Sequence, residues 1–238
     1  MPSIEIPQQY LNSERYCPVC ETGCEKFGPY GDAEVPDARC PNCTTMERYR
    51  LLYLYLKNET DFFTSPRTVL DIGPRTEFSK ICLKQKRLKY VSIDLSSPRA
   101  MVKSDITKLA FPPNTFDTIF CYHVLEHVPE HPALVEIRRV LKPGGVVYFQ
   151  VPIDINRHET FEVPNAKPED YERLYGQKDH LRVYGLNFPQ VVERAGFDVV
   201  QIKYVDSFSG SERLKLGLKD TYRLKNYTTC EDMYLASK

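Results

Sequence analysis

The stretch "TFDTIFCYHVLEHVPEHPALVEIRRVLKPGGVVYFQVP" (115–152) predicts a strand, a helix and a second strand in direct succession. The apolar runs at 116–123 and 145–152 are nearly continuous, which is typical of strands buried on both faces of a sheet. Between them lies an apolar stripe at helical spacing, formed by Leu134, Ile137 and Leu141. We expect Pro143-Gly144-Gly145 to end that helix.

The same alternation continues in both directions along the chain. Further strands are expected at 68–73, 89–95, 100–105, 197–205 and 231–238. Another helix is expected to begin after Asn187 and to end at Gly196. Strands that alternate with helices favour an α/β fold with a mostly parallel sheet and right-handed crossovers.

Acidic residues follow several of these strands, at the edge of the sheet where such folds bind ligands. Asp94 lies roughly 20 residues after Gly73, a spacing typical of an acid that accepts hydrogen bonds from ribose hydroxyls. Asp105 could accept a hydrogen bond from the exocyclic amine of adenine. Each acid taken alone is equally consistent with a loop carboxylate or a helix cap.

The loop after the first strand, "DIGPRTEF" (71–78), departs from dinucleotide-binding loops. It has Gly73 but no G-x-G-x-x-G, and Pro74 removes one backbone donor. Glu77 adds negative charge where a pyrophosphate would lie. The loop therefore disfavours NAD and FAD, and it favours a cofactor that carries a sulfonium and an ammonium in place of phosphates.

Two C-x2-C pairs stand near the N-terminus, Cys17 with Cys20 and Cys40 with Cys43. Their spacing predicts a zinc site of four thiolates, which would be structural because no coordination position remains open. Cys24 is an alternative ligand nearby. A redox role would need a thioredoxin-like context that this segment lacks.

A helix is expected directly after the second cysteine pair. Thr44 and Glu47 fit a capping box. An apolar stripe follows, formed by Tyr49, Leu52, Tyr53 and Leu56. This stripe must bury against a larger partner, so we expect a zinc knuckle with its N-terminal extension at 1–46 to dock onto a domain at 47–238.

The bulk composition of the 238 residues is that of an ordinary globular protein. Lys plus Arg and Asp plus Glu both number 32, which makes nucleic acid an unlikely partner because sequence-independent binding needs a net basic surface. No apolar run is long enough to span a membrane, and the N-terminus lacks the features of a signal peptide. We expect a cytoplasmic protein with no membrane partner, and we expect its cysteines to be reduced. Its oligomeric state is not predicted.

The motifs "VLDIG", "SIDL", "KSDITKLAFPPNTFDTIFCYHVLEHV" and "EIRRVLKPGGVVYFQVP" resemble those of class I S-adenosylmethionine-dependent methyltransferases of the type-11 group. The resemblance covers residues 67 to about 205. The cysteine segment and "YGQKDHLRVYG" (175–185) are similar to a bacterial subgroup with an N-terminal cysteine knuckle. The resemblance implies a Rossmann-like seven-stranded sheet in the order 3-2-1-4-5-7-6, with the last strand antiparallel.

The resemblance also implies a cofactor site for S-adenosylmethionine at the strand ends. Its members would be Asp71 and Gly73 at the amino-acid part, Asp94 at the ribose, Leu95, Asp105 and Ile106 at the adenine, and Tyr122 and His123 at the methionine end. The missing second glycine leaves open a non-catalytic copy of the fold.

Histidines are the candidate general bases. His123 comes first, because plant small-molecule O-methyltransferases, which the chain resembles here, place a catalytic histidine at about this point. His180 comes second and His127 third; each is also consistent with a structural role. Arg182 could bind an acidic group of the acceptor.

Two long inserts interrupt the α/β pattern. The first, 153–186, contains Tyr175 and Tyr184 and is expected to form a lid over the acceptor. The second, 206–230, is expected to hold a solvated helix, with binding of an acidic partner as the alternative.

Three functions fit the sequence. The first is O- or N-methylation of a small molecule or glycan. The second is methylation of RNA or protein, with the zinc knuckle docking the substrate; "CYHV" (121–124) lacks the Asn/Asp-Pro-Pro-Tyr tetrad of base N-methylation. The third is a non-catalytic cofactor-binding or scaffold protein.

Overall fold

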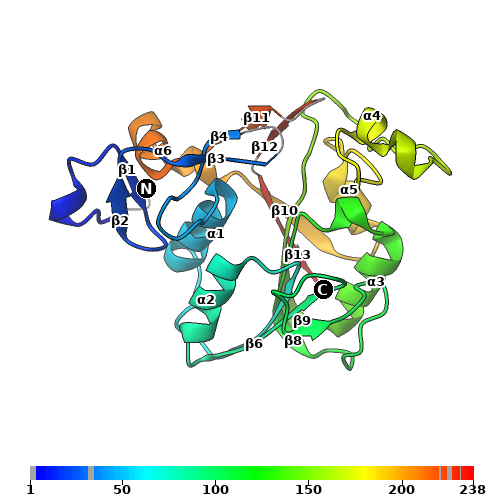
Figure 1. The fold of residues 1–238 in the computed structure, drawn as a ribbon. Helices are drawn as coiled ribbons and strands as arrows, with labels where there is room; N and C mark the ends of the chain where they lie inside the picture. Colours follow the sequence, from blue (N-terminus) through cyan, green and yellow to red (C-terminus); the bar gives the residue numbers. More distant parts are fainter. Residues whose placement is uncertain (1–3, 32–34, 220, 224–226, 231) are drawn as a thin grey trace.

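The computed structural model describes residues 4–31, 35–219, 221–223, 227–230 and 232–238, and its centre is a seven-stranded sheet (Figure 1). The strands are β5 (Arg67–Ile72), β6 (Leu88–Asp94), β7 (Val102–Lys103), β8 (Phe116–Tyr122), β9 (Leu141–Gln150), β10 (Asp198–Ile202) and β13 (Met233–Ser237). They lie in the order β7-β6-β5-β8-β9-β13-β10, and β13 is antiparallel to both of its neighbours. The expected order 3-2-1-4-5-7-6 is confirmed.

Helices cover both faces of this sheet (Figure 1). Helices α1 (Glu47–Asn58) and α2 (Thr76–Lys84) lie on one face, and α3 (Glu130–Val140) and α5 (Phe188–Glu193) lie on the other. Two apolar cores result, and β8 contributes alternate side chains to each of them. Burial on both faces explains why the central strands read as continuous apolar runs.

Several boundaries differ from the sequence expectation. The third strand is only two residues long, and the sixth ends at Ile202 before a 3-10 turn, η4 (Tyr204–Ser207). Leu141, which we placed on a helix, begins β9 and pairs with Phe116. The Pro143-Gly144-Gly145 segment lies inside β9, where the register shifts and Gly144 has φ +73°. Position 231 of the last expected strand lies outside the described residues.

The N-terminal module consists of short antiparallel hairpins. A 3-10 turn, η1 (Gln8–Tyr10), precedes the pair β1 (Arg15–Cys17) and β2 (Thr22–Cys24), which is followed by β3 (Gly28–Tyr30) and β4 (Val35–Arg39). In the stripe on α1, Tyr49, Leu52 and Leu56 are buried in the same core as the sheet, as expected for a docked module, and Tyr53 is half-buried.

The expected capping box is wrong. Thr44 has φ +64°, and its hydroxyl donates a hydrogen bond to Glu77 of α2. The cap of α1 is Met46, whose side chain makes no capping hydrogen bond. The tight turn of the second cysteine pair therefore takes Thr44 away from the helix and turns it toward the loop that follows β5.

The second insert is attached to the N-terminal module. It contains α6 (Gly210–Leu216), which lies beside β1, and the hairpin β11 (Thr221–Arg223) with β12 (Thr228–Cys230) (Figure 1). Lys215 donates to the backbone carbonyl oxygens of Tyr10 at 3.0 Å and of Leu11 at 3.1 Å. The expected helix is present and is exposed or half-buried except at Leu216, and one side of it packs against the module.

One buried arginine joins these parts. The side chain of Arg50 is 0% exposed, and it donates hydrogen bonds to four backbone carbonyls. Two belong to the knuckle, Ala38 at 2.9 Å and Thr45 at 2.7 Å. The other two belong to the second insert, Leu216 at 2.8 Å and Gly217 at 2.7 Å. Arg50 thus fixes the knuckle, α1 and α6 relative to one another.

The first insert contains a 3-10 turn, η3 (Pro168–Asp170), and a short helix, α4 (Tyr171–Tyr175). Isolated bridges of Ile153 with Tyr184 and of Phe161 with Val183 join its two ends to each other. No helix in the described part of the chain has the length and apolar character needed to cross a membrane.

We predict that Arg50→Ala lowers the free energy of unfolding by about 3–5 kcal/mol, because buried carbonyls lose charge-assisted hydrogen bonds. Urea denaturation followed by circular dichroism measures the change. The matched control is Lys57→Ala, an exposed cation on the same helix, which should change the free energy by less than about 0.5 kcal/mol. Equal effects of both substitutions would contradict the role of Arg50.

Candidate functional site

The loop after β5 passes close to the chain that follows β8. Gly73 has φ +69°, and its amide donates to the carbonyl of Ile93 at 2.9 Å. A Cβ added at Gly73 would lie 2.7 Å from Cγ2 of Val124. Only glycine fits here without displacing the neighbouring segment.

The predicted acid at the end of β5 is buried. Asp71 accepts a hydrogen bond from the hydroxyl of Tyr90 at 2.6 Å. Burial raises the pKa of Asp71 to about 7, although the Tyr90 hydrogen bond lowers it. A cation placed beside this carboxyl would favour its ionised form.

The acids after β6 and β7 each keep one oxygen available. Asp94 uses Oδ1 to accept from the amides of Ser96 at 2.8 Å and Ser97 at 2.7 Å. Asp105 uses Oδ1 to accept from the amide and the hydroxyl of Thr107, both at 2.8 Å, and these bonds lower its pKa. Oδ2 of Asp94 and Oδ2 of Asp105 accept no hydrogen bond from the described residues.

An apolar surface lies next to these acids. Leu95 is 61% exposed, Met101 56% and Val102 42%, while Ile106 is buried. Such a group of exposed large side chains at strand ends is suited to be covered by a flat aromatic base. Together with Gly73, this surface and the two carboxylate oxygens fit the parts of S-adenosylmethionine.

Two arginines, which the sequence analysis missed, lie near the predicted methionine end. Arg48 on α1 is buried and donates to Glu47 at 3.1 Å. Arg48 and Arg75 stand over the ring of Tyr30 at 5.6 and 6.0 Å from its centre. Both also lower the pKa of His123, so they share its electrostatic environment. Only the docking of the knuckle brings them together, and no local motif signals it.

His123 occupies an unusual backbone position directly after β8. Its φ is +54°, and its amide donates to the carbonyl of Gln150 at 2.8 Å. Its Nδ1 lies 3.3 Å from Oε1 of Glu126. Burial lowers the pKa of His123, as do Arg48 and Arg75, against the opposing effect of Glu126. The imidazole is therefore neutral near pH 7.

The three predicted histidines come together around Glu126. The imidazole centres of His127 and His180 are 4.8 Å apart, and Nε2 of His127 lies 3.9 Å from Oε1 of Glu126. Burial lowers the pKa of His180 to about 4. Burial opposes ionisation of Glu126, yet the neighbouring imidazole of His123 lowers its pKa to about 2. The sequence analysis missed Glu126, although it lies within the quoted "LEHV" motif (125–128).

The predicted acceptor contacts of the first insert are not supported. Arg182 is buried and donates to the carbonyls of Leu125 and Val128, both at 2.7 Å. Tyr184 is buried and donates to Glu130 at 2.7 Å, and Tyr175 lies in a small core of the insert. Arg182 and Tyr184 hold the insert against the turn η2 (Leu125–His127), and in doing so they place His180 beside Glu126.

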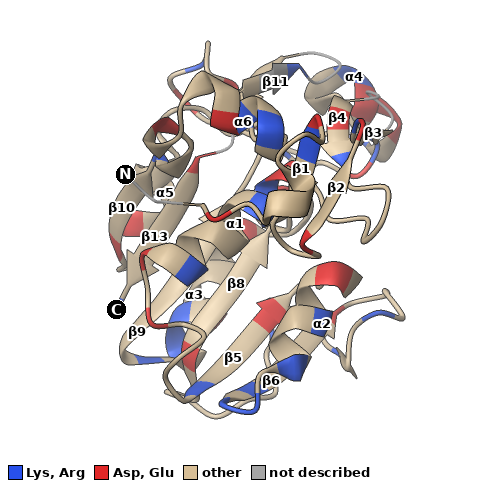
Figure 2. Ribbon diagram, turned by 90° about the vertical axis from the view of Figure 1, so that its left-hand side faces the viewer, with Lys and Arg blue, Asp and Glu red and all other residues tan. Residues whose placement is uncertain are grey.

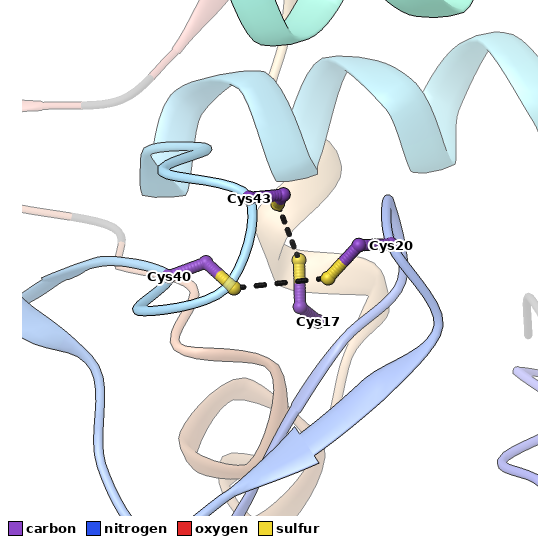
Figure 3. Close-up of side chains that lie close together, drawn as sticks. All are labelled: Cys17, Cys20, Cys40 and Cys43. Atoms are coloured by element: carbon purple, nitrogen blue, oxygen red, sulfur yellow. Dashed lines mark hydrogen bonds between the residues drawn. The ribbon is translucent and has the colours of Figure 1, made fainter.

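The four expected cysteines form a compact cluster (Figure 3). Sγ of Cys17 lies 3.7 Å from Sγ of Cys43, and Sγ of Cys20 lies 3.8 Å from Sγ of Cys40. A tetrahedral zinc ion with Zn–S bonds of about 2.3 Å requires sulfur separations of about 3.8 Å. The arrangement therefore fits the expected ion, and Cys24 lies outside the cluster.

The fold and the strand-end site define the class. A seven-stranded sheet with this order and an antiparallel last strand is the class I methyltransferase fold. A solved methyltransferase from Archaeoglobus fulgidus, described as SAM-dependent, superposes with a TM-score of 0.51 over 80% of this chain and 94% of that one. Its sequence is 18% identical, so the comparison concerns the fold.

A family model described as a methyltransferase domain matches residues 46–202, and the chain belongs to this family. A probable methyltransferase, ltbC, from Aspergillus luteorubrus is 56% identical over 97 residues, which cover 38% of this chain and 34% of that protein. A ubiquinone biosynthesis O-methyltransferase from Paraburkholderia xenovorans is 53% identical over 101 residues, which cover 35% and 43%. The chain thus spans less than half the length of these relatives.

We predict that the purified chain holds about one tightly bound zinc ion, and that Cys17→Ser loses it. Loss of a ligand thiolate opens the site and should also lower the unfolding temperature. Atomic absorption gives the zinc content, and Cys24→Ser is the control that should retain the ion. A Cys17→Ser variant with the wild-type zinc content would rule out the four-thiolate site.

Proposed function

We propose that this chain transfers a methyl group from S-adenosylmethionine to an oxygen or nitrogen of a small molecule or glycan. The observation that supports this most is the convergence of Gly73, Asp94 and His123 at the carboxyl ends of β5, β6 and β8. Family membership supports the reaction class. We further propose a cytoplasmic protein that belongs to the bacterial subgroup with a cysteine knuckle.

The chain's own residues would hold the cofactor by its charges and its apolar parts. Asp71 would face the ammonium, and Asp94 would accept hydrogen bonds from the ribose hydroxyls through Oδ2. The apolar surface around Leu95 would cover the adenine, together with Ile106. Arg48 and Arg75 would provide positive charge for the carboxylate of the cofactor. In glycine-rich loops, backbone amides supply this positive charge instead. S-adenosylmethionine, when bound, supplies an electrophilic methyl group on sulfur.

His123 would serve as the general base. Its ring is neutral near pH 7, so it can accept the proton that an acceptor hydroxyl loses. Glu126, which is ionised, then stabilises the imidazolium at a distance of 3.3 Å. As the acceptor oxygen forms its bond to the methyl carbon, the carbon–sulfur bond breaks and its electron pair stays on sulfur.

A small acceptor is favoured over RNA or protein. The formal charge of the chain is zero, and on the face shown in Figure 2 basic and acidic residues are interspersed. The ubiquinone biosynthesis enzyme, one of the similar proteins, is an O-methyltransferase by name. The Thr44–Glu77 contact joins the knuckle to the start of α2, next to the proposed cofactor loop. The knuckle therefore has a structural role that does not require a macromolecular substrate.

Asp94→Ala should weaken binding of S-adenosylmethionine about 10- to 100-fold, because hydrogen bonds to an ionised carboxylate are lost. Isothermal titration calorimetry measures the affinity. The control is Asp198→Ala, an exposed acid on the edge strand β10, which should bind as the wild type does. Wild-type affinity in Asp94→Ala would mean that the ribose lies elsewhere, and no binding by the wild type would refute the proposed function.

His123→Ala should lower turnover by about 10²- to 10⁴-fold while cofactor affinity is kept. The assay uses a hydroxyl acceptor that the wild-type chain methylates in a screen. The base works in its neutral form, and its pKa is lowered from 6.5, so wild-type activity should fall as the pH is lowered, with a midpoint below 6.5. His158→Ala, an exposed histidine, is the control. Full activity in His123→Ala, or a wild-type midpoint above pH 6.5, would exclude His123 as the base.

A further inference from the structure

The carboxylate of Glu126 is a buried charge that accepts no hydrogen bond from the described residues. Its side chain is 1% exposed, and within the described residues neither carboxylate oxygen accepts a hydrogen bond. The imidazole of His123, 3.3 Å away, is near but not aligned for one. A buried carboxylate costs several kcal/mol unless other groups compensate it, about as much as the loss of a core side chain. An additional partner is therefore expected.

The groups next to Glu126 are metal ligands. One ligand atom each from Glu126, His127 and His180 lie within 4.8 Å of one another. Nδ1 of His180 is buried and has no hydrogen-bond partner among the described residues. Three ligand atoms from buried or half-buried residues thus lie close together. Hydrogen bonds among the three side chains do not explain why they are grouped.

His127 is oriented as metal-bound histidines usually are. Its Nδ1 lies 3.1 Å from the carbonyl oxygen of Asp179 and 3.3 Å from the carboxylate of the same residue. A proton on Nδ1 would be donated to Asp179, which leaves Nε2 with a lone pair on the side of Glu126. Such an outer partner fixes the tautomer and raises the basicity of the ligand.

The backbone keeps this arrangement in place. The amide of Leu181 donates to the carbonyl of Glu126 at 2.8 Å, so the segment with His180 is fastened to the turn with Glu126. Arg182 fastens the same segment to Leu125 and Val128. The ligands come from two parts of the chain that are held together before any ion binds, as a pre-organised site requires.

We propose that Glu126, His127 and His180 bind a divalent transition-metal ion, and that this ion holds the hydroxyl oxygen of the methyl acceptor. Two imidazoles and one carboxylate suit transition-metal ions, whereas Mg²⁺ prefers sites made of oxygen. Three protein ligands leave coordination positions open, in contrast to the closed cysteine cluster. The role of the ion toward the acceptor rests on the proposed function; the binding of the ion does not.

A metal at this point favours a hydroxyl over an amine as the methyl acceptor. An oxygen bound to a divalent ion loses its proton at a lower pH than a free hydroxyl does. His123 lies beside Glu126 and is placed to accept that proton. The ion and the base would then act on the same acceptor oxygen, one by lowering its pKa and the other by taking its proton.

The test is a titration of the full chain, with zinc in the cysteine cluster, by Co²⁺. Calorimetry should show about one Co²⁺ bound per chain. The visible spectrum should lack sulfur-to-cobalt charge-transfer bands, because the ligands are nitrogen and oxygen. Glu126→Gln, which keeps the side-chain volume, and His180→Ala should each weaken Co²⁺ binding at least about tenfold. His158→Ala is exposed, lies outside the cluster and should bind Co²⁺ as the wild type does.

The metal site is refuted if the wild-type chain binds no Co²⁺, if only sulfur-to-cobalt bands appear, or if Glu126→Gln binds Co²⁺ unchanged. Unfolding curves show whether each variant is folded. If His180→Ala is not folded, the Co²⁺ affinity of Glu126→Gln alone decides the test. Titration with S-adenosylmethionine separates the two proposals. Cofactor binding without Co²⁺ binding refutes the metal site and leaves the proposed function standing. Co²⁺ binding without cofactor binding supports the metal site and refutes the proposed function.

Discussion

The buried guanidinium of Arg50 is the contact on which the arrangement of the N-terminal module depends. A zinc ion with four thiolates carries net negative charge. Burial lowers the pKa of Arg50, and Cys17, Cys40 and Cys43 lie close enough to oppose this shift. The cation therefore offsets part of the cluster's negative charge while its donors bind carbonyls of the knuckle and of the second insert. This contact also fixes the start of α1, which carries Arg48 toward the strand-end site.

In the proposed cofactor site, the position of α1 would compensate for the glycine-poor loop after β5. A glycine-rich loop presents backbone amides to an anionic group, and Pro74 removes one of them here. Arg48 and Arg75 bring charged donors to the same region, and Thr44 of the knuckle binds Glu77 of α2. If these arginines hold the cofactor as proposed, the missing second glycine does not mark a degenerate site.

The sheet could be predicted from the sequence because burial on both faces leaves continuous apolar runs between helical stripes. The strand-end candidates followed from that pattern. The capping box failed because Thr44 is held by a residue far along the chain. Arg182, Tyr175 and Tyr184 were assigned to the acceptor because a sequence shows that polar or aromatic groups are present, but not whether they point inward. Arg48 and Glu126 were missed for the same reason.

The backbone of His123 shows what the site requires of the fold. A left-handed residue other than glycine costs about 1–2 kcal/mol, and glycine would adopt φ +54° without this cost. The turn brings the side chain of residue 123 back toward Glu126, three residues later, at 3.3 Å. Glycine would satisfy the backbone but would provide no imidazole there. A strained histidine at the end of the central strand is thus better explained by the chemistry of its ring than by the needs of the turn.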